Sequence, residues 1–114
     1  MLNLMLKSFG INSSMLHSMM PQKKRTTNLY NFRSQITKVL ISTDLASRGL
    51  DIPSVDLVIN MECPRKPDAY VHRVGRTARA FKSGYSLTFV NQYSEENLLR
   101  VEQYIGIKMG NEMT

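Results

Sequence analysis

The apolar residues at the start of the chain predict an amphipathic helix. They recur three or four positions apart, as on one face of an α-helix, and comprise Leu2, Met5, Leu6 and Phe9. Gly10 is a natural end for this helix. The segment from Ile11 to His17 is interpreted as a short strand. A chain that opens directly on a helix is expected to be the tail portion of a longer protein.

Three further helices follow from the same spacing. The expected ranges are Pro21–Arg33, Asp68 to Val74 or Arg76, and Ser94–Gly106. Proline suits a first helical position, Asp68 is a plausible cap, and Gly106 is a natural end. The residues expected on buried faces are Leu29, Phe32, Leu98, Val101 and Ile105.

Between these helices lie runs of aliphatic residues bounded by polar ones, which predict strands. They are Lys38–Ser42, Asp56–Asn60 and Tyr85–Val90. Strands that alternate with helices favour an α/β domain with a largely parallel sheet. Ligands of such sheets bind beyond the carboxyl ends of the strands. The polar loop from Thr43 to Pro53 is therefore expected where a functional loop should lie.

Composition narrows the class of protein. The 114 residues suit one domain, and their net charge of +6 favours polyanionic partners. The apolar runs are too short to cross a bilayer, so no membrane partner is expected. A single cysteine, Cys63, excludes an internal disulfide and fits an intracellular, reducing compartment. We interpret it as a small packed residue.

Three polar segments carry candidate chemistry. The loop from Ser42 to Asp51 combines hydroxyls, an arginine, a glycine and two carboxylates, which suit phosphate and ribose contacts. Alternatively, its carboxylates form turns and pair with Arg48. The basic run Gln22–Arg25 is either a solvated helix end or a phosphate anchor. The third segment places arginines three apart, at Arg73, Arg76 and Arg79.

On a helix these three arginines would share one face, and guanidinium groups bind phosphate through a bidentate fork. An exposed basic helix face or an ion-pair network is the alternative for such a triplet. The segments STDLASRGLDIP and YVHRVGRTAR nevertheless closely resemble the fifth and sixth motifs of DEAD-box RNA helicases. LHSMMPQKKR resembles the Gln-x-x-Arg segment of that family, and the resemblance extends from about Leu2 to Met109.

The resemblance implies a RecA-like three-layer α/β domain, with a mostly parallel sheet flanked by helices and lacking its first strand. It implies that residues 1–109 form a partial helicase C-terminal domain and 110–114 a tail. Arg76 and Arg79 would act as catalytic arginine fingers on ATP, and Asp51 would contact its ribose, with Gly49 shaping the loop. His72 and Arg73 would couple this site to a facing first domain. The residues implied in RNA binding are Thr43, Arg48, Gln22 and Arg25.

The implied partners are single-stranded or duplex RNA and a first RecA-like domain. That domain would hold Mg²⁺ with ATP, so no metal ligand is expected in this chain. The sequence has no phosphate loop and no Asp-Glu-Ala-Asp segment, so the chain alone is predicted to be inactive as an ATPase. A non-catalytic basic RNA- or protein-binding module and an inert remnant remain alternatives. Val90–Tyr93 and the following helix resemble members that act in ribosome assembly, which implies pre-ribosomal particles and the nucleus or nucleolus.

Overall fold

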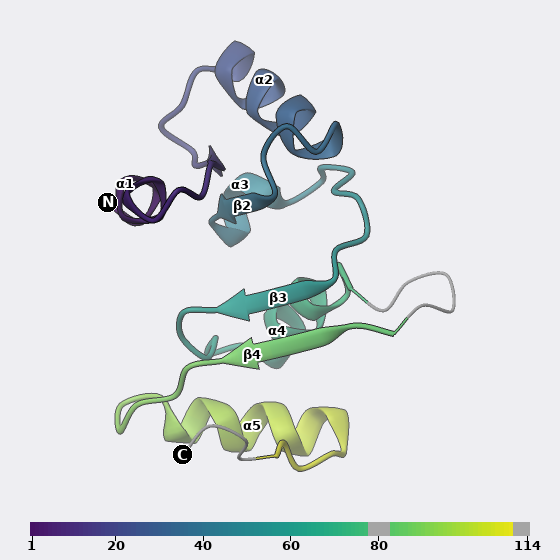
Figure 1. The fold of residues 1–114 in the computed structure, drawn as a ribbon. Helices are drawn as coiled ribbons and strands as arrows, with labels where there is room; N and C mark the ends of the chain where they lie inside the picture. Colours follow the sequence, from purple (N-terminus) through teal and green to yellow (C-terminus); the bar gives the residue numbers. More distant parts are fainter. Residues whose placement is uncertain (78–82, 111–114) are drawn as a thin grey trace. The chain divides into compact units, whose positions relative to one another are not determined.

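A computed structural model describes residues 1–77 and 83–110 of the chain (Figure 1). They form two compact units, one from Met1 to Pro53 and the other beginning at Ser54. Each unit contains a pair of parallel strands and the helices packed on it. The predicted α/β class and the parallel strand direction are thus confirmed. Within the described segments, no helix is long and apolar enough to span a membrane.

The first unit is built on two parallel strands. Its elements in chain order are α1 (Leu2–Ser8), β1 (Ser13–Leu16), α2 (Gln22–Arg33), β2 (Val39–Ser42) and α3 (Asp44–Ser47). Ser13 lies opposite Val39 and Leu16 opposite Ser42. The helix α2 provides the crossover that two parallel neighbouring strands require. The sequence pattern predicted a loop from Thr43 to Pro53. The structure instead has the short helix α3 near the start of this segment, capped by the Thr43 side chain.

The core of the first unit joins β1, α2 and the segment after β2. Leu16, Leu29, Ala46 and Ile52 are buried together, and Phe32, Leu40 and Leu50 pack against them. The prediction of Leu29 and Phe32 as the inward face of α2 is confirmed. Inside β1, the buried Ser14 hydroxyl shares a 2.6 Å hydrogen bond with Thr37. This bond satisfies a polar group that would otherwise cost stability.

The helix α1 forms as predicted, but its apolar face is only partly buried within the first unit: Leu2 and Leu6 are half-buried. Met5 is 54% exposed and Phe9 is 77% exposed. A polar contact anchors the helix instead: the Asn3 amide donates to the Ser13 carbonyl at 3.0 Å and to its hydroxyl at 2.7 Å. Helical spacing predicted the helix correctly, whereas the burial of its apolar residues depends on the neighbours that the tertiary structure supplies.

The second unit repeats the strand and helix alternation. Its elements are β3 (Leu57–Asn60), α4 (Pro67–Val74), β4 (Tyr85–Thr88) and α5 (Glu95–Ile105). The strands β3 and β4 are parallel, with Leu57 opposite Tyr85 and Asn60 opposite Thr88. The buried Asn60 amide donates to the Thr88 hydroxyl across the pair at 3.1 Å. Figure 1 shows the two strands side by side.

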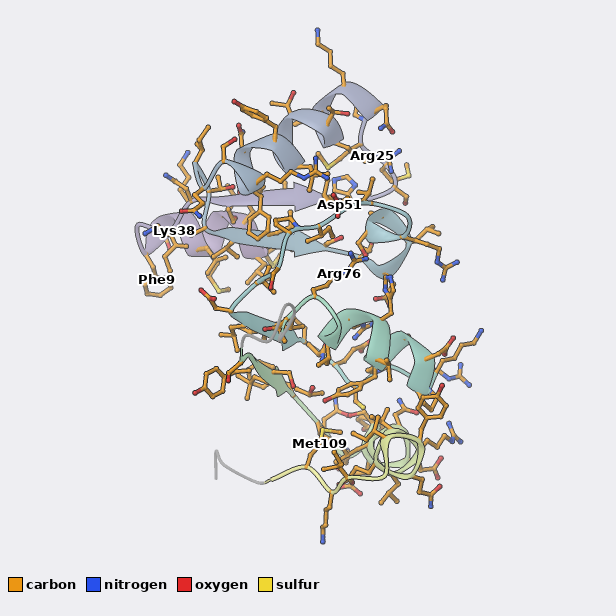
Figure 2. The ribbon with its side chains drawn as sticks, turned by 90° about the vertical axis from the view of Figure 1, so that its right-hand side faces the viewer. Phe9, Arg25, Lys38, Asp51, Arg76 and Met109 are labelled. Carbon is orange, nitrogen blue, oxygen red and sulfur yellow. The ribbon has the colours of Figure 1, made fainter. Side chains whose placement is uncertain are left out.

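The core of the second unit joins α4 to α5. Cys63, Tyr70 and Val101 are buried together, with Val74, Leu98, Ile105 and Met109 packed against them. The Tyr70 hydroxyl donates to the Met109 sulfur at 3.4 Å, and Figure 2 shows Met109 beside α5. Burial raises the pKa of the Cys63 thiol, the charge of Arg73 opposes this, and Glu102 adds to it. The interpretation of Cys63 as a packed residue is confirmed.

In the second unit the start of α4 differs from the sequence pattern, whereas both ends of α5 agree with it. The cap of α4 is Lys66 rather than Asp68, because Pro67 supplies the first helical position. The helix α5 begins after Ser94 and ends at Gly106, as predicted. The Ser94 hydroxyl makes no cap bond to the helix; it accepts instead from the Asn91 backbone N–H at 3.0 Å.

Candidate functional site

Thr43 fixes the start of the candidate loop. Its backbone N–H donates to the Leu16 carbonyl at 3.3 Å, which continues the contact between β1 and β2. Its hydroxyl accepts from the Ala46 N–H at 3.2 Å and so caps α3. Because Thr43 remains exposed, its hydroxyl can still donate to a ligand oxygen while it serves as the cap.

Gly49 turns the chain after α3. Its backbone φ is +76°, a left-handed value that residues with a side chain rarely adopt. An added Cβ would meet no heavy atom within 4 Å, so the requirement for glycine is conformational rather than steric. The turn leaves Arg48 exposed at the end of α3 and brings the chain to Asp51.

Asp51 presents its carboxylate to solvent while its backbone is held in place. Arg33 donates to the Asp51 carbonyl through Nε at 3.1 Å and through Nη2. The carboxylate of Asp51 is 97% exposed and lies 4.0 Å from the same guanidinium, a distance at which an exposed ion pair contributes little. The carboxylate is therefore available to a ligand. Sequence reasoning missed Arg33, since no local motif marks the end of α2 as a support for this loop.

Gln22 and Arg25 lie together in the first turn of α2. The Arg25 Nη2 donates to the Gln22 side-chain oxygen at 2.7 Å. The Arg25 Nε is buried and has no hydrogen-bond partner among the described residues. Such a donor costs about 1–3 kcal/mol, so it calls for a structural or functional explanation. Figure 2 shows Arg25 on this helix.

A hollow of about 360 Å³ brings several predicted residues of the first unit together. Gln22, Arg25 and Arg48 all line it. The full lining is Gln22, Arg25, Thr26, Leu29, Tyr30, Arg33, Leu45, Ala46, Arg48 and Leu50. Three of the four residues predicted to bind RNA therefore share one surface between α2 and α3, and the fourth, Thr43, caps α3.

The arginine segment of the second unit is not a continuous helix face. The helix α4 ends at Val74, so Arg73 is helical while Arg76 lies in the turn that follows Gly75. The turn closes with hydrogen bonds from the Arg76 N–H to the Arg73 carbonyl at 3.3 Å and from the Thr77 N–H to the Val74 carbonyl at 3.0 Å. The prediction of a shared helical face is wrong for Arg76, and Arg79 lies outside the described residues.

Val55 holds the chain at Arg76 and Thr77. The Val55 N–H donates to the Arg76 carbonyl at 2.8 Å, and the Thr77 hydroxyl donates to the Val55 carbonyl. Thr77 is 5% exposed and forms a parallel bridge with Val55. This pairing draws the chain into extended conformation, which is the physical reason that the helix does not continue. Neither Val55 nor Thr77 was singled out from sequence.

His72 and Arg73 make separate contacts. The Arg76 Nη2 lies 3.0 Å from the His72 Nε2. Guanidinium nitrogens only donate, so Nε2 is the acceptor in this contact. Arg73 Nη1 donates to the Glu62 carbonyl at 3.2 Å. His72 is therefore in contact with Arg76, while Arg73 ties α4 to the segment that follows β3.

The net positive charge of the chain lies mainly in the first unit. Between Met1 and Pro53 the chain has seven lysines and arginines against two carboxylates. The rest of the chain has eight against seven. Among the described residues, no three histidine, cysteine or acidic side chains are grouped so that they could hold a metal ion. The surface chemistry of the first unit thus favours anionic ligands.

Comparisons with known proteins identify the family. The helicase conserved C-terminal domain family matches residues 1–81. The chain is 52% identical to the ATP-dependent RNA helicase dbp8 of Emericella nidulans over 109 residues, which are 96% of this chain and 21% of that protein. The chain therefore spans about a fifth of the length of this relative.

Solved structures share the fold. The E. coli DEAD-box protein SrmB, bound to regulator of ribonuclease activity A, matches with a TM-score of 0.91 and 36% identity over 99% of this chain and 66% of that chain. A variant of S. cerevisiae Dbp5, bound to RNA and ADP BeF3, matches with a TM-score of 0.82 and 34% identity over 99% of this chain and 30% of that chain. The predicted RecA-like fold is confirmed, and the chain belongs to the helicase conserved C-terminal domain family of the DEAD-box RNA helicases.

Proposed function

We propose that the described site residues supply one half of an ATPase and RNA-binding site, completed by a first RecA-like domain. Membership of the DEAD-box RNA helicases implies ATP use and RNA binding by the whole helicase. The observation that carries the proposal is Asp51: its carbonyl is held by Arg33 while its carboxylate is 97% exposed. A fixed backbone with a solvent-facing carboxylate suits a ribose, whose hydroxyls donate to it.

The nucleotide contacts are assigned to the loop from Ser42 to Asp51 and to the segment that contains Arg76 and Arg79. Asp51 accepts from the ribose, and Gly49 shapes the loop that carries it. Arg76 and Arg79 act as arginine fingers that stabilise negative charge developing on the transferred phosphoryl group. The hydrogen bonds of Val55 with the Arg76 carbonyl and the Thr77 hydroxyl support this role for Arg76, because a finger needs a fixed base.

The RNA contacts are assigned to the first unit. Gln22, Arg25 and Arg48 share the hollow, and Thr43 presents a hydroxyl at the carboxyl end of β2. Such groups bind phosphate and sugar and carry no base information, so binding independent of sequence is expected. The solved Dbp5 bound to RNA and ADP BeF3 supports the assignment by similarity.

His72 and Arg73 are assigned to coupling with the first domain. His72 is exposed, so it can contact the first domain, and its contact with Arg76 links that domain to the proposed arginine finger. The Mg²⁺ that accompanies ATP neutralises phosphate charge and is assigned to the first domain. Residues 1–109 are proposed as the domain unit, with 110–114 as a tail of which residues 111–114 lie outside the described part.

Pre-ribosomal particles are proposed as the setting, with the nucleus or nucleolus as the compartment. Support comes from the likeness of Val90–Tyr93 and the following helix to members that act in ribosome assembly. Co-sedimentation of the tagged protein with pre-ribosomal fractions tests this proposal, and exclusive recovery in light fractions contradicts it.

The ATPase assignment is tested by joining the chain to a complete DEAD-box first domain. Arg76→Ala should lower RNA-stimulated ATP turnover about a thousandfold, because a finger stabilises the transition state rather than the substrate. RNA affinity should be nearly unchanged. The chain without a first domain should show no turnover.

Arg100→Ala is the matched control for Arg76→Ala. This exposed arginine lies on α5 and contacts only Glu96, at 3.8 Å, among the ion pairs of the described residues. Full turnover is expected in the control. Equal turnover in Arg76→Ala and Arg100→Ala would refute the finger assignment.

A second candidate is a non-catalytic basic module that binds RNA or protein. The observation that favours it is the charge of the first unit, with seven basic and two acidic residues. Such a module binds RNA without any effect of nucleotide. The two candidates are separated by adding ATP to an RNA titration of the fused protein, since only the helicase domain predicts that ATP tightens RNA binding.

A further inference from the structure

The hollow between α2 and α3 has an apolar floor and a basic rim. Leu29 and Ala46 are buried in its floor, at 7% and 3% exposure. Leu45 and Tyr30 also line it but are 65% and 62% exposed. These two side chains give the hollow an apolar surface that water contacts.

The rim supplies hydrogen-bond donors and few acceptors. Arg25, Arg33 and Arg48 carry only N–H groups. Some of these already donate, from Arg25 to Gln22 and from Arg33 to the Asp51 carbonyl. The side-chain oxygen of Gln22 already accepts from Arg25 at 2.7 Å. The Thr26 hydroxyl donates to the Gln22 carbonyl at 3.0 Å, so toward a ligand it can only accept. The side chains around the hollow therefore suit a ligand that combines acceptors with an apolar group.

A carboxylate beside an apolar side chain has this combination. Carboxylates only accept, and arginine binds them through two parallel hydrogen bonds. A nucleobase fits less well, because its Watson–Crick edge carries at least one N–H donor, for which this arginine-rich rim offers few acceptors. The volume of about 360 Å³ lies at the small end of the ~300–1,000 Å³ range of ligand pockets and accommodates one large side chain.

We infer that this hollow docks an acidic peptide segment of a protein partner, with one aromatic or aliphatic anchor on the Leu45 and Tyr30 surface and carboxylates on the arginine rim. An acidic peptide is the occupant because its negative charge complements the arginine rim. In protein interfaces, a buried apolar anchor surrounded by a polar rim usually supplies most of the binding energy. This inference goes beyond the proposed function.

The rim of the hollow shares residues with the proposed RNA surface. Arg25 and Arg48 are proposed RNA contacts and also line the hollow. A bound acidic segment would occupy their N–H groups and compete with RNA phosphate. Leu45 and Tyr30 belong only to the peptide surface, so substitutions there separate the two activities.

The test uses the full 114-residue chain and a fluorescent peptide that has one tryptophan between two pairs of glutamates. Leu45→Ala and Tyr30→Ala are each expected to weaken peptide binding at least about tenfold, the scale of an interface hot spot. Leu99→Ala is the matched control, because Leu99 is 59% exposed on α5, outside the hollow. The same variants should bind an oligouridine like the unsubstituted chain. Circular dichroism verifies that all of them fold.

Two altered peptides separate the contribution of the glutamates to binding from that of the tryptophan. Replacing the glutamates by glutamines should weaken binding because the rim loses its charged acceptors, and replacing the tryptophan by alanine should weaken it because the floor loses its anchor. The inference is overturned if Leu45→Ala and Tyr30→Ala bind the peptide as tightly as Leu99→Ala. It is also overturned if the glutamine peptide binds equally well, or if both variants weaken oligouridine binding instead, which would assign the hollow to RNA. None of these readings depends on ATP turnover.

Discussion

At the scale of single residues, hydrogen bonds decide which atoms remain for ligands. Arg33 engages the carbonyl of Asp51 and leaves its carboxylate 97% exposed. His72 accepts from Arg76 at 3.0 Å and restrains a side chain that has several rotatable bonds. A long side chain that is already restrained loses less entropy when it reaches a phosphate. Supporting residues such as Arg33 and His72 therefore belong to the site even without contacting a ligand.

His72→Ala and His72→Gln test this restraint in the protein fused to a first domain. Alanine removes the acceptor, so turnover should fall about fivefold, the equivalent of one neutral hydrogen bond of about 1 kcal/mol. Glutamine retains an acceptor and should keep most of the turnover. Steady-state ATPase assays measure the difference. Equal losses in both variants would show that His72 acts on the first domain and not through Arg76.

At the scale of elements, the ends of helices determine where functional residues lie. Thr43 starts α3 with a side-chain cap, and the pairing of Val55 with Thr77 ends the helical path after α4. At the end of α5, Gly106 has a φ of +74° and its N–H donates to the Glu102 carbonyl at 2.9 Å. Glu102 also accepts from the Met109 N–H at 2.8 Å, which returns the chain to the core.

Gly106→Ala should therefore destabilise the folded chain. An added Cβ meets nothing within 4 Å, so the expected loss of about 1–2 kcal/mol comes from the left-handed backbone alone. Gly106→Asn should lose less, since asparagine tolerates this conformation. Urea unfolding followed by circular dichroism measures both. Equal stability of the alanine variant and the unsubstituted chain would contradict the assigned cap.

At the scale of the whole molecule, charge is divided unequally along the chain. The first 53 residues have seven basic and two acidic residues, and the remainder has eight and seven. RNA binding by Lys and Arg releases counterions, so affinity falls as salt rises. The first unit is expected to dominate this electrostatic attraction.

Arg25→Gln and Arg48→Gln should each reduce the dependence of RNA affinity on salt. For single strands, each lost phosphate contact lowers the slope of log affinity against log salt by about 0.7. Fluorescence anisotropy with an oligouridine across a salt series measures the slope. Arg100→Gln serves as the control, because Arg100 lies on α5 and faces Glu96 at 3.8 Å. A slope that Arg25→Gln and Arg48→Gln leave unchanged would remove these residues from the RNA surface.

The order of helices and strands apart from α3, the parallel strand direction and the family were all determined by the sequence alone. Local spacing suffices for these features, because the inward residues Leu29 and Val101 follow helical periodicity and the two motifs are specific. The end of α5 at Gly106 could also be predicted from the local sequence, since glycine adopts the left-handed backbone angle found there at little cost.

Contacts between distant residues were decided by the tertiary structure. Arg33 reaches Asp51 across 18 positions, and Val55 fixes Thr77 across 22, so no local pattern could reveal either contact. The extended pairing at Thr77 overrides the helical spacing of the arginines and takes Arg76 off the helix. The exposed Met5 and Phe9 have the same explanation: periodicity defines a face, whereas packing decides whether that face is buried.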